Sequence, residues 1–148
     1  MAEVKINVYA KNRFLNRTVR PYLRKKAEEI VDEARRRAPV GATGELENSF
    51  MIFDGPNGGV QIRNTAAHAG YVHQGTGPQA NPPRAAYYPK LRRRGLILWS
   101  ESKGLDAGSV ARGIAVKGTA PNPFLEEALQ TVLARYNFRW IRRDLVVN

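Results

Sequence analysis

The stretch from residue 34 to residue 50 constrains the fold most, because the hydrophobic pattern changes there. Apolar residues recur at steps of three or four before it and alternate after it. Pro39 disfavours a helical conformation at the preceding residue, so a helix must end near Ala38. Gly44 can adopt a positive φ, and Thr43 can satisfy free backbone groups. We therefore interpret Pro39, Thr43 and Gly44 as a structural turn between a helix and a sheet.

The residues before this turn predict one strand and one long helix. Residues 3–9 alternate between apolar and polar side chains, which is typical of a half-buried strand. Residues 12–16 are interpreted as a connector. An amphipathic helix is predicted from Thr18 as its N-cap, with Pro21 in its first turn. Its apolar face consists of residues at helical spacing: Val19, Leu23, Ala27, Ile30, Ala34 and Ala38.

The residues after the turn predict a β-hairpin. Residues 50–54 and 60–64 are short, apolar-rich segments on either side of a Gly/Asn/Pro stretch. Residues 66–77 can continue as a further strand or as a tight loop. Residues 78–83 contain three Pro and are expected to form an irregular loop.

The C-terminal half contains weaker signals and one strong one. Residues 96–101 fit a strand or a short helix, and Asp106 can cap another short helix. Asn122 is predicted as the N-cap of a second long amphipathic helix, with Pro123 at its first helical position. This helix is expected to run to about residue 143, followed by a tail or a last edge strand over residues 144–148.

These elements predict one α+β domain over residues 1–148. Two long amphipathic helices on one face of a small antiparallel sheet would bury both apolar stripes. Residues 84–117 are interpreted as a variable, loop-rich insertion, and residues 144–148 as a tail.

Composition narrows the classes of function. The net charge is +11, from 24 Lys and Arg against 13 Asp and Glu, which suggests an acidic partner or nucleic acid. The chain has no Cys, which excludes disulfides, thiolate chemistry and Cys-based zinc sites and fits maturation in a reducing cytoplasm. The longest apolar run, at residues 96–99, is too short to span a membrane, and no signal peptide is evident.

No catalytic or metal-binding set stands out in the sequence, and no cofactor is expected. His68 and His73 lack the His-Glu-x-x-His spacing and a third ligand. No Ser lies in a Gly-x-Ser-x-Gly elbow. Asp54, Glu101 and Asp106 could form a nuclease-like carboxylate group, but nothing in the sequence fixes their geometry. Residues 75–77, Gly-Thr-Gly, lack the frame of a phosphate-binding loop and are interpreted as turning a strand at a subunit edge.

The best candidate for a functional patch is a basic cluster, made of Lys90, Arg92, Arg93 and Arg94. On a loop it could line a DNA channel or hold an acidic neighbour, since Arg contacts phosphates without reading bases; the alternative is a solvated loop. Near the C-terminus, Trp140 and Arg142 are candidates for a subunit interface, because Trp and Arg are enriched there. Packing on the same subunit is the alternative. Residues 35–37, Arg-Arg-Arg, point in different directions on a helix and suit a solvated face or a subunit contact.

Four short motifs occur in order along the chain. They are Ala38-Pro39, Thr-Gly-x-Leu-x-x-Ser at residues 43–49, Tyr-Val-x-x-Gly-Thr-Gly at residues 71–77, and Pro-x-Pro-Phe-Leu at residues 121–125. In this order the chain resembles the tail-completion or head–tail joining proteins of long-tailed bacteriophages, a group that includes the lambda-type minor tail protein Z. One departure is the pair His73 and Gln74, where many members carry an acidic residue before the Gly-Thr.

The resemblance implies a non-enzymatic virion protein at the neck or the head-proximal end of the tail. Such proteins typically form a six-fold ring around the DNA channel, between a head-side adaptor, connector or stopper protein and the tail tube protein. The chain would assemble in the host cytoplasm and contact the genome non-specifically, without a membrane. A ring would be expected to use Tyr71, His73, Gln74 and Thr76 between subunits. The alternative hypothesis is a sequence-independent nucleic-acid-binding protein, which the net charge favours.

Overall fold

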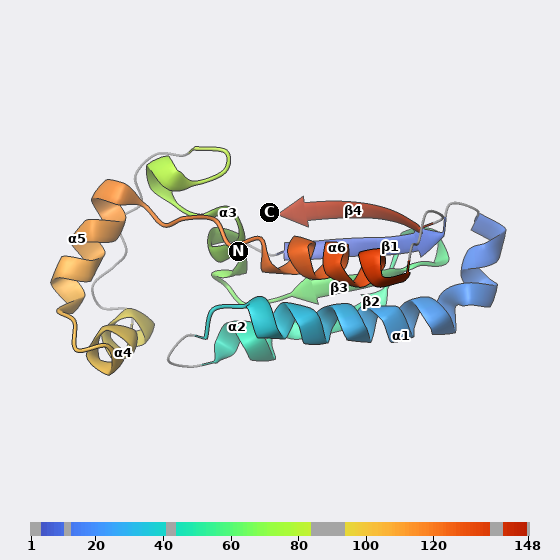
Figure 1. The fold of residues 1–148 in the computed structure, drawn as a ribbon, viewed down its shortest axis with the longest axis horizontal. Helices are drawn as coiled ribbons and strands as arrows, with labels where there is room; N and C mark the ends of the chain where they lie inside the picture. Colours follow the sequence, from blue (N-terminus) through green and yellow to red (C-terminus); the bar gives the residue numbers. More distant parts are fainter. Residues whose placement is uncertain (1–3, 11–12, 41–43, 84–93, 137–140, 148) are drawn as a thin grey trace.

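A sheet covered on one face by two helices forms the larger part of the molecule (Figure 1). The computed structural model describes residues 4–10, 13–40, 44–83, 94–136 and 141–147. Helices α4 (Arg94–Ser102) and α5 (Ala107–Lys117) stand at one end, beyond the sheet. We call these two helices the arm, and the sheet with its neighbouring helices the body.

The sheet has four antiparallel strands in the order β2-β3-β1-β4. They are β1 (Val4–Ala10), β2 (Phe50–Asp54), β3 (Val60–Asn64) and β4 (Ile141–Val147). The register aligns Ile52 of β2 with Ile62 of β3, Ile62 with Ile6 of β1, and Ile6 with Leu145 of β4. The predicted hairpin at residues 50–64 is confirmed with its bounds.

One face of this sheet carries the core. Ile6, Ile62 and Val60 are fully or almost fully buried there, because alternate residues of a strand point to the same side. Helices α1 (Arg13–Arg37) and α6 (Phe124–Tyr136) bury their apolar stripes against this face and against each other. This arrangement confirms the predicted α+β class with two long helices on one face.

Helix α1 begins earlier than predicted. The structure places its first residue at Arg13, so residues 13–16 are helical and Thr18 is not the N-cap. Pro21 lies inside the helix instead of in its first turn. Tertiary packing explains this tolerance, because Leu23, Ala27 and the later stripe residues are fully buried and hold the helix in place.

Helix α6 is shorter than predicted, and the chain does not end in a tail. The helix stops at Tyr136, and residues 141–147 form strand β4, which pairs with the edge of β1. The alternative of a last edge strand is therefore the correct one. The predicted cap is also displaced by one residue: the carbonyl of Pro123 accepts from the amide of Glu127 at 2.9 Å, while the side chain of Asn122 donates to the carbonyl of Arg37.

The segment predicted as a further strand or a loop is helical. Helix α3 (Ala69–Gln74) follows the hairpin, and the short helix α2 (Glu45–Asn48) precedes it. Ala66, Ala69, Gly70 and His73 are buried at the helical steps of three and four. This signal was missed because three of the four are small and do not stand out as hydrophobic. The remaining short turns are η1 (Pro56–Gly58) and η2 (Gly77–Gln79).

The middle segment contains more structure than a loop. Residues 96–101 belong to helix α4, which confirms the helical alternative. Helix α5 is capped as predicted, since the carboxylate of Asp106 accepts from the amide of Ser109 at 2.7 Å. No helix in the described ranges is long and apolar enough to cross a membrane.

Candidate functional site

The turn between α1 and the sheet has a structural role. Gly44 adopts φ +61°, which confirms the expected positive φ. Leu46 is buried, and its carbonyl accepts from the side-chain amide of Asn64 at 2.7 Å. The other end of the Asn64 side chain accepts from the amide of Ala66 at 3.1 Å, so a fully buried polar group is satisfied at both ends. Pro39 is exposed at the helix end, and Thr43 lies outside the described residues.

The Gly-Thr-Gly motif attaches the arm to the body. Thr76 and Thr119 exchange backbone hydrogen bonds of 3.0 and 3.1 Å, and their hydroxyls lie 2.9 Å apart. Gly75 and Gly118 have φ near +76° and +75°, and a Cβ on either would collide with the opposite backbone. We call this crossing the arm root. The motif follows a helix, so its interpretation as the turn of a strand is wrong.

His73 belongs to the core and is almost fully buried. Its side chain is about 5% exposed, and its ring packs edge-on against Phe124 at 5.7 Å. Phe124 in turn packs edge-on against Phe50 at 5.9 Å. The Nε2 atom is buried with no hydrogen-bond partner among the described residues. Burial lowers the pKa of His73, and the nearby carboxylates of Glu126 and Glu127 oppose this shift.

The residues predicted for the subunit interface differ in their exposure. His73 and Thr76 are buried within the chain, whereas Tyr71 is 40% exposed and Gln74 is half-buried. Trp140 lies outside the described residues, and Arg142 is placed only by register, opposite Tyr9 of β1. Their use between subunits stays a prediction.

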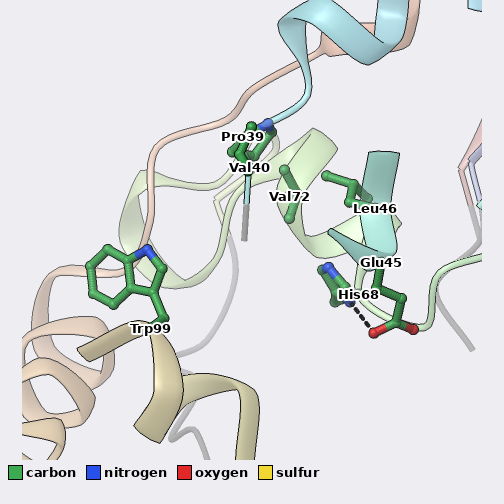
Figure 2. A pocket seen from close by; sticks show the side chains of 7 residues that line it. All are labelled: Pro39, Val40, Glu45, Leu46, His68, Val72 and Trp99. Atoms are coloured by element: carbon green, nitrogen blue, oxygen red, sulfur yellow. Dashed lines mark ion pairs between the residues drawn. The ribbon is translucent and has the colours of Figure 1, made fainter. Parts of the chain in front are cut away.

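A hollow separates the arm from the body (Figure 2). We call it the notch; its volume is about 180 Å³. Its lining is mainly apolar and comes from four separate segments: Pro39, Val40, Glu45, Leu46, His68, Val72 and Trp99. Val40 is 74% exposed, and Trp99 reaches the notch from α4. His68 Nδ1 lies 4.0 Å from a carboxylate oxygen of Glu45 on the rim.

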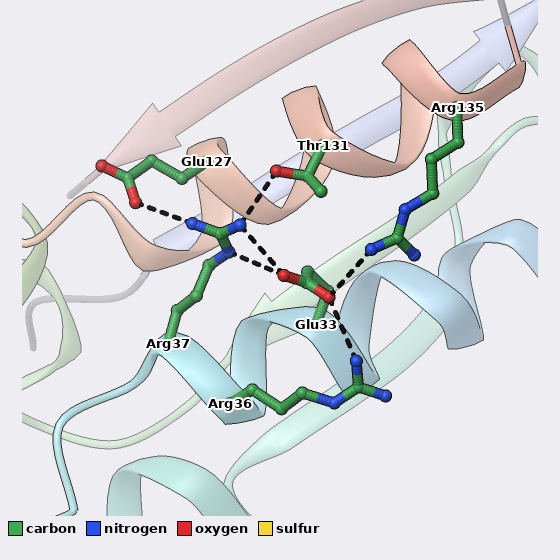
Figure 3. A network of polar contacts seen from close by, with 6 residues as sticks. All are labelled: Glu33, Arg36, Arg37, Glu127, Thr131 and Arg135. Atoms are coloured by element: carbon green, nitrogen blue, oxygen red, sulfur yellow. Dashed lines mark hydrogen bonds and ion pairs between the residues drawn. The ribbon is translucent and has the colours of Figure 1, made fainter.

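A polar network fastens α1 to α6 (Figure 3). The carboxylate of Glu33, only 9% exposed, pairs with Arg37 at 3.0 Å and with Arg135 of α6 at 3.5 Å. Arg37 also reaches Glu127 at 3.2 Å and the hydroxyl of Thr131 at 3.0 Å. Because the contacts join two helices, the network fixes their relative position.

Basic side chains of α1 are used inside the chain. Within residues 35–37, Arg36 pairs with Glu33 at 3.3 Å and Arg35 with Asp32 at 3.4 Å. The ammonium of Lys26 lies 3.6 Å from the ring centre of Tyr136, and its hydrogen bond to Glu29 raises its pKa. These contacts direct much of the positive charge of α1 to its own carboxylates.

The predicted basic cluster falls mostly outside the described residues. Lys90, Arg92 and Arg93 lie there, and Arg94 is the exposed first residue of α4. A contact of this cluster with DNA or with an acidic partner therefore stays a prediction.

The acidic side chains considered for catalysis do not converge. Asp54 pairs with Arg20 at 3.4 Å on one side of the body, and Asp106 caps α5 in the arm. The hydrogen bonds from Ser109 lower the pKa of Asp106. Within the part of the chain that the structure describes, no group of three or more His, Asp or Glu could hold a metal ion.

Comparison with known protein families finds a match in the N-terminal half of the chain. Residues 5–75 match the HK97-gp10_like family model, described as "Bacteriophage HK97-gp10, putative tail-component". The matched segment contains β1, α1, the hairpin and α3, and it stops at the arm root. No curated protein and no solved structure matches the chain.

Proposed function

On the premise that residues 5–75 relate this chain to the HK97-gp10-like bacteriophage tail components, we propose that it is a ring-forming structural subunit at the head–tail junction. The ring surrounds the channel through which the genome passes. The family match carries this proposal, because it covers the part of the body in which the first two ordered motifs and most of the third occur. The function is therefore tail completion or head–tail joining in a long-tailed phage.

The proposed assembly contains six copies in a closed ring. A head-side adaptor, connector or stopper protein lies on one side and the tail tube protein on the other. The protein assembles in the host cytoplasm and ends in the virion. A body whose helices are fixed by the Glu33 network suits such a building block, since a ring needs subunits of one shape.

The arrangement of polar groups supports a structural role over a catalytic one. The buried polar groups described above hold elements together: Asn64 joins two turns, and Glu33 joins two helices. Asp54 and Asp106 serve an ion pair and a helix cap at separate places. A site for bond breaking would instead bring such groups together at one cleft.

Mass measurement and imaging of the purified full-length protein test this function. We expect particles of several subunits with a central opening, and a sixfold mass would support the hexamer. A chain that stays monomeric, both alone and with the neck proteins of its phage, would contradict the proposal.

A second candidate is sequence-independent binding of nucleic acid, which the charge of +11 favours. It requires the free protein to bind duplex DNA, with a log–log salt slope of about −0.9 per phosphate contact. Titration of a labelled duplex at several salt concentrations separates the two candidates. Weak binding by the free protein would remove this candidate and leave the ring in place.

A further inference from the structure

The arm is poorly supported by its own chain. In α4 the one buried residue is Ser100, and in α5 the buried residues are Ala111 and Ala115. Helices of nine and eleven residues are marginal in water without tertiary packing. Apolar side chains nevertheless remain exposed here: Leu98 of α4 at 36%, Val116 of α5 at 75%, and Leu105 between the two helices at 49%. The arm therefore carries surface that its own body does not cover.

The outer face of α5 is a defined patch. Its exposed residues follow the helical steps of three and four: Ser109, Arg112, Gly113, Val116 and Lys117. Gly113 has nothing within 4 Å of where a Cβ would stand, so a partner can approach the backbone closely. Arg112 precedes Val116 by one helical turn on the same face, and Lys117 is the next residue. The patch is apolar at its centre and positive at its rim.

The notch has the complementary character. Its floor is apolar, with Leu46 and Val72, and Val40 beside it is 74% exposed. Its rim carries the carboxylate of Glu45, 4.0 Å from His68, and Glu47 follows on the same short helix, outside the lining. A volume of about 180 Å³ admits one aliphatic side chain with space to spare.

We propose that the outer face of α5 docks into the notch of a second copy of this chain. Val116 enters the hollow beside Val40, while Arg112 and Lys117 face the carboxylates of Glu45 and Glu47. The occupant is a second copy because the chain presents both surfaces, with opposite charge and matching apolar centres. The inference rests on the proposed ring, and it names the contact between neighbouring subunits.

The two surfaces differ, and each subunit uses one of each, so the interface is head-to-tail. Head-to-tail contacts close into a ring when the rotation fits and otherwise continue as a filament. This property agrees with a ring and disagrees with a symmetric dimer.

A charge swap in the full-length protein tests the contact. One variant carries Glu45→Lys with Glu47→Lys, and another carries Arg112→Glu with Lys117→Glu. Each should raise the protein concentration needed for half assembly by about tenfold or more, because like charges then face each other. The four-residue combination should restore assembly to near the wild-type concentration. Sedimentation at several concentrations measures all of them.

A control variant changes the same number of charges away from both proposed surfaces. Arg24→Glu with Lys25→Glu makes the same charge change at exposed positions of α1 and should leave assembly unchanged. Circular dichroism establishes that each variant is folded. If wild type assembles and both charge-reversed variants assemble equally well, or the combination fails to restore assembly, the docking is wrong and the ring stands. If wild type stays monomeric with its neck proteins present, the ring itself is wrong.

Discussion

The body and the arm are held by different means. In the body, Ile30 of α1 and Phe124 of α6 are fully buried against the sheet, and ion pairs join the two helices. In the arm, two helices bury little more than Ala111, Ala115 and Ser100, and one crossing at Thr76 and Thr119 attaches them. Both regions are helical, yet among the residues that the structure describes the large hydrophobic core belongs to the body.

This difference indicates which region provides most of the free energy of folding and which region leaves apolar side chains exposed. Burial of large apolar side chains provides most of the free energy of folding, so the body accounts for it. The arm leaves apolar side chains such as Val116 exposed. Substitutions in the two regions should therefore have unequal effects on the free energy of unfolding.

Phe124→Ala should have the largest effect. It removes a fully buried ring that packs on both Phe50 and His73, and we expect the free energy of unfolding to fall by about 3–5 kcal/mol. Val116→Ala in the arm should change it by less than about 0.5 kcal/mol. Urea unfolding measures both, and equal losses would contradict the division between body and arm.

Glu33→Ala tests the link between the body helices. It leaves Arg37 and Arg135 without their shared carboxylate. We expect the free energy of unfolding to fall by about 2 kcal/mol; partial exposure of both cations to water limits the loss. Glu28→Ala, at an exposed position of the same helix, is the control. If both variants unfold at the same urea concentration, the network does not stabilise the helix pair.

Gly118→Ala should weaken the arm root and leave the body folded. Residue 118 must keep φ near +75° with ψ near −170°, which is essentially a Gly conformation, and the new Cβ would meet the Thr76 backbone. We therefore expect a local cost of about 1–3 kcal/mol. Limited proteolysis should cleave the arm about tenfold faster. Gly113→Ala, at an open helical position, should slow cleavage instead. Faster cleavage in both variants would refute this role for the crossing.

Acid should weaken the body through His73. Burial lowers its pKa in the folded state, whereas the unfolded chain takes up a proton near pH 6.5. The free energy of unfolding should therefore fall as the pH drops below about 6.5, by at most about 1.4 kcal/mol per pH unit. Urea unfolding between pH 7 and pH 5 measures this slope. His73→Phe should flatten it and His68→Gln should not; an unchanged slope in His73→Phe would assign it to other groups.

The body could largely be predicted from the sequence. Period-two and helical patterns marked β1, the hairpin and the stripe of α1 because each pattern reflects burial on one side. The boundaries failed where tertiary packing overrides local signals. Pro21 inside α1 and strand β4 after α6 are examples, since β4 exists only because β1 offers it an edge.

The candidate site was less predictable. The sequence drew attention to the Gly-Thr-Gly motif. The partner of its Thr76, Thr119, lies 43 residues away, and no local sequence pattern predicts that pairing. The notch brings together Val40, Leu46 and Trp99 from distant segments, so periodicity alone cannot assemble it. His73 was assigned to a surface because its burial depends on Phe124, which lies far along the chain.

The pairing of Thr76 with Thr119, 43 residues apart in the sequence, closes a loop that carries the arm. Each doubling of the length of such a loop costs only about 0.6 kcal/mol. Insertions, deletions and substitutions in this loop are therefore compatible with an unchanged sheet. A protein whose contacts change over time can therefore replace these residues and keep the rest of its fold.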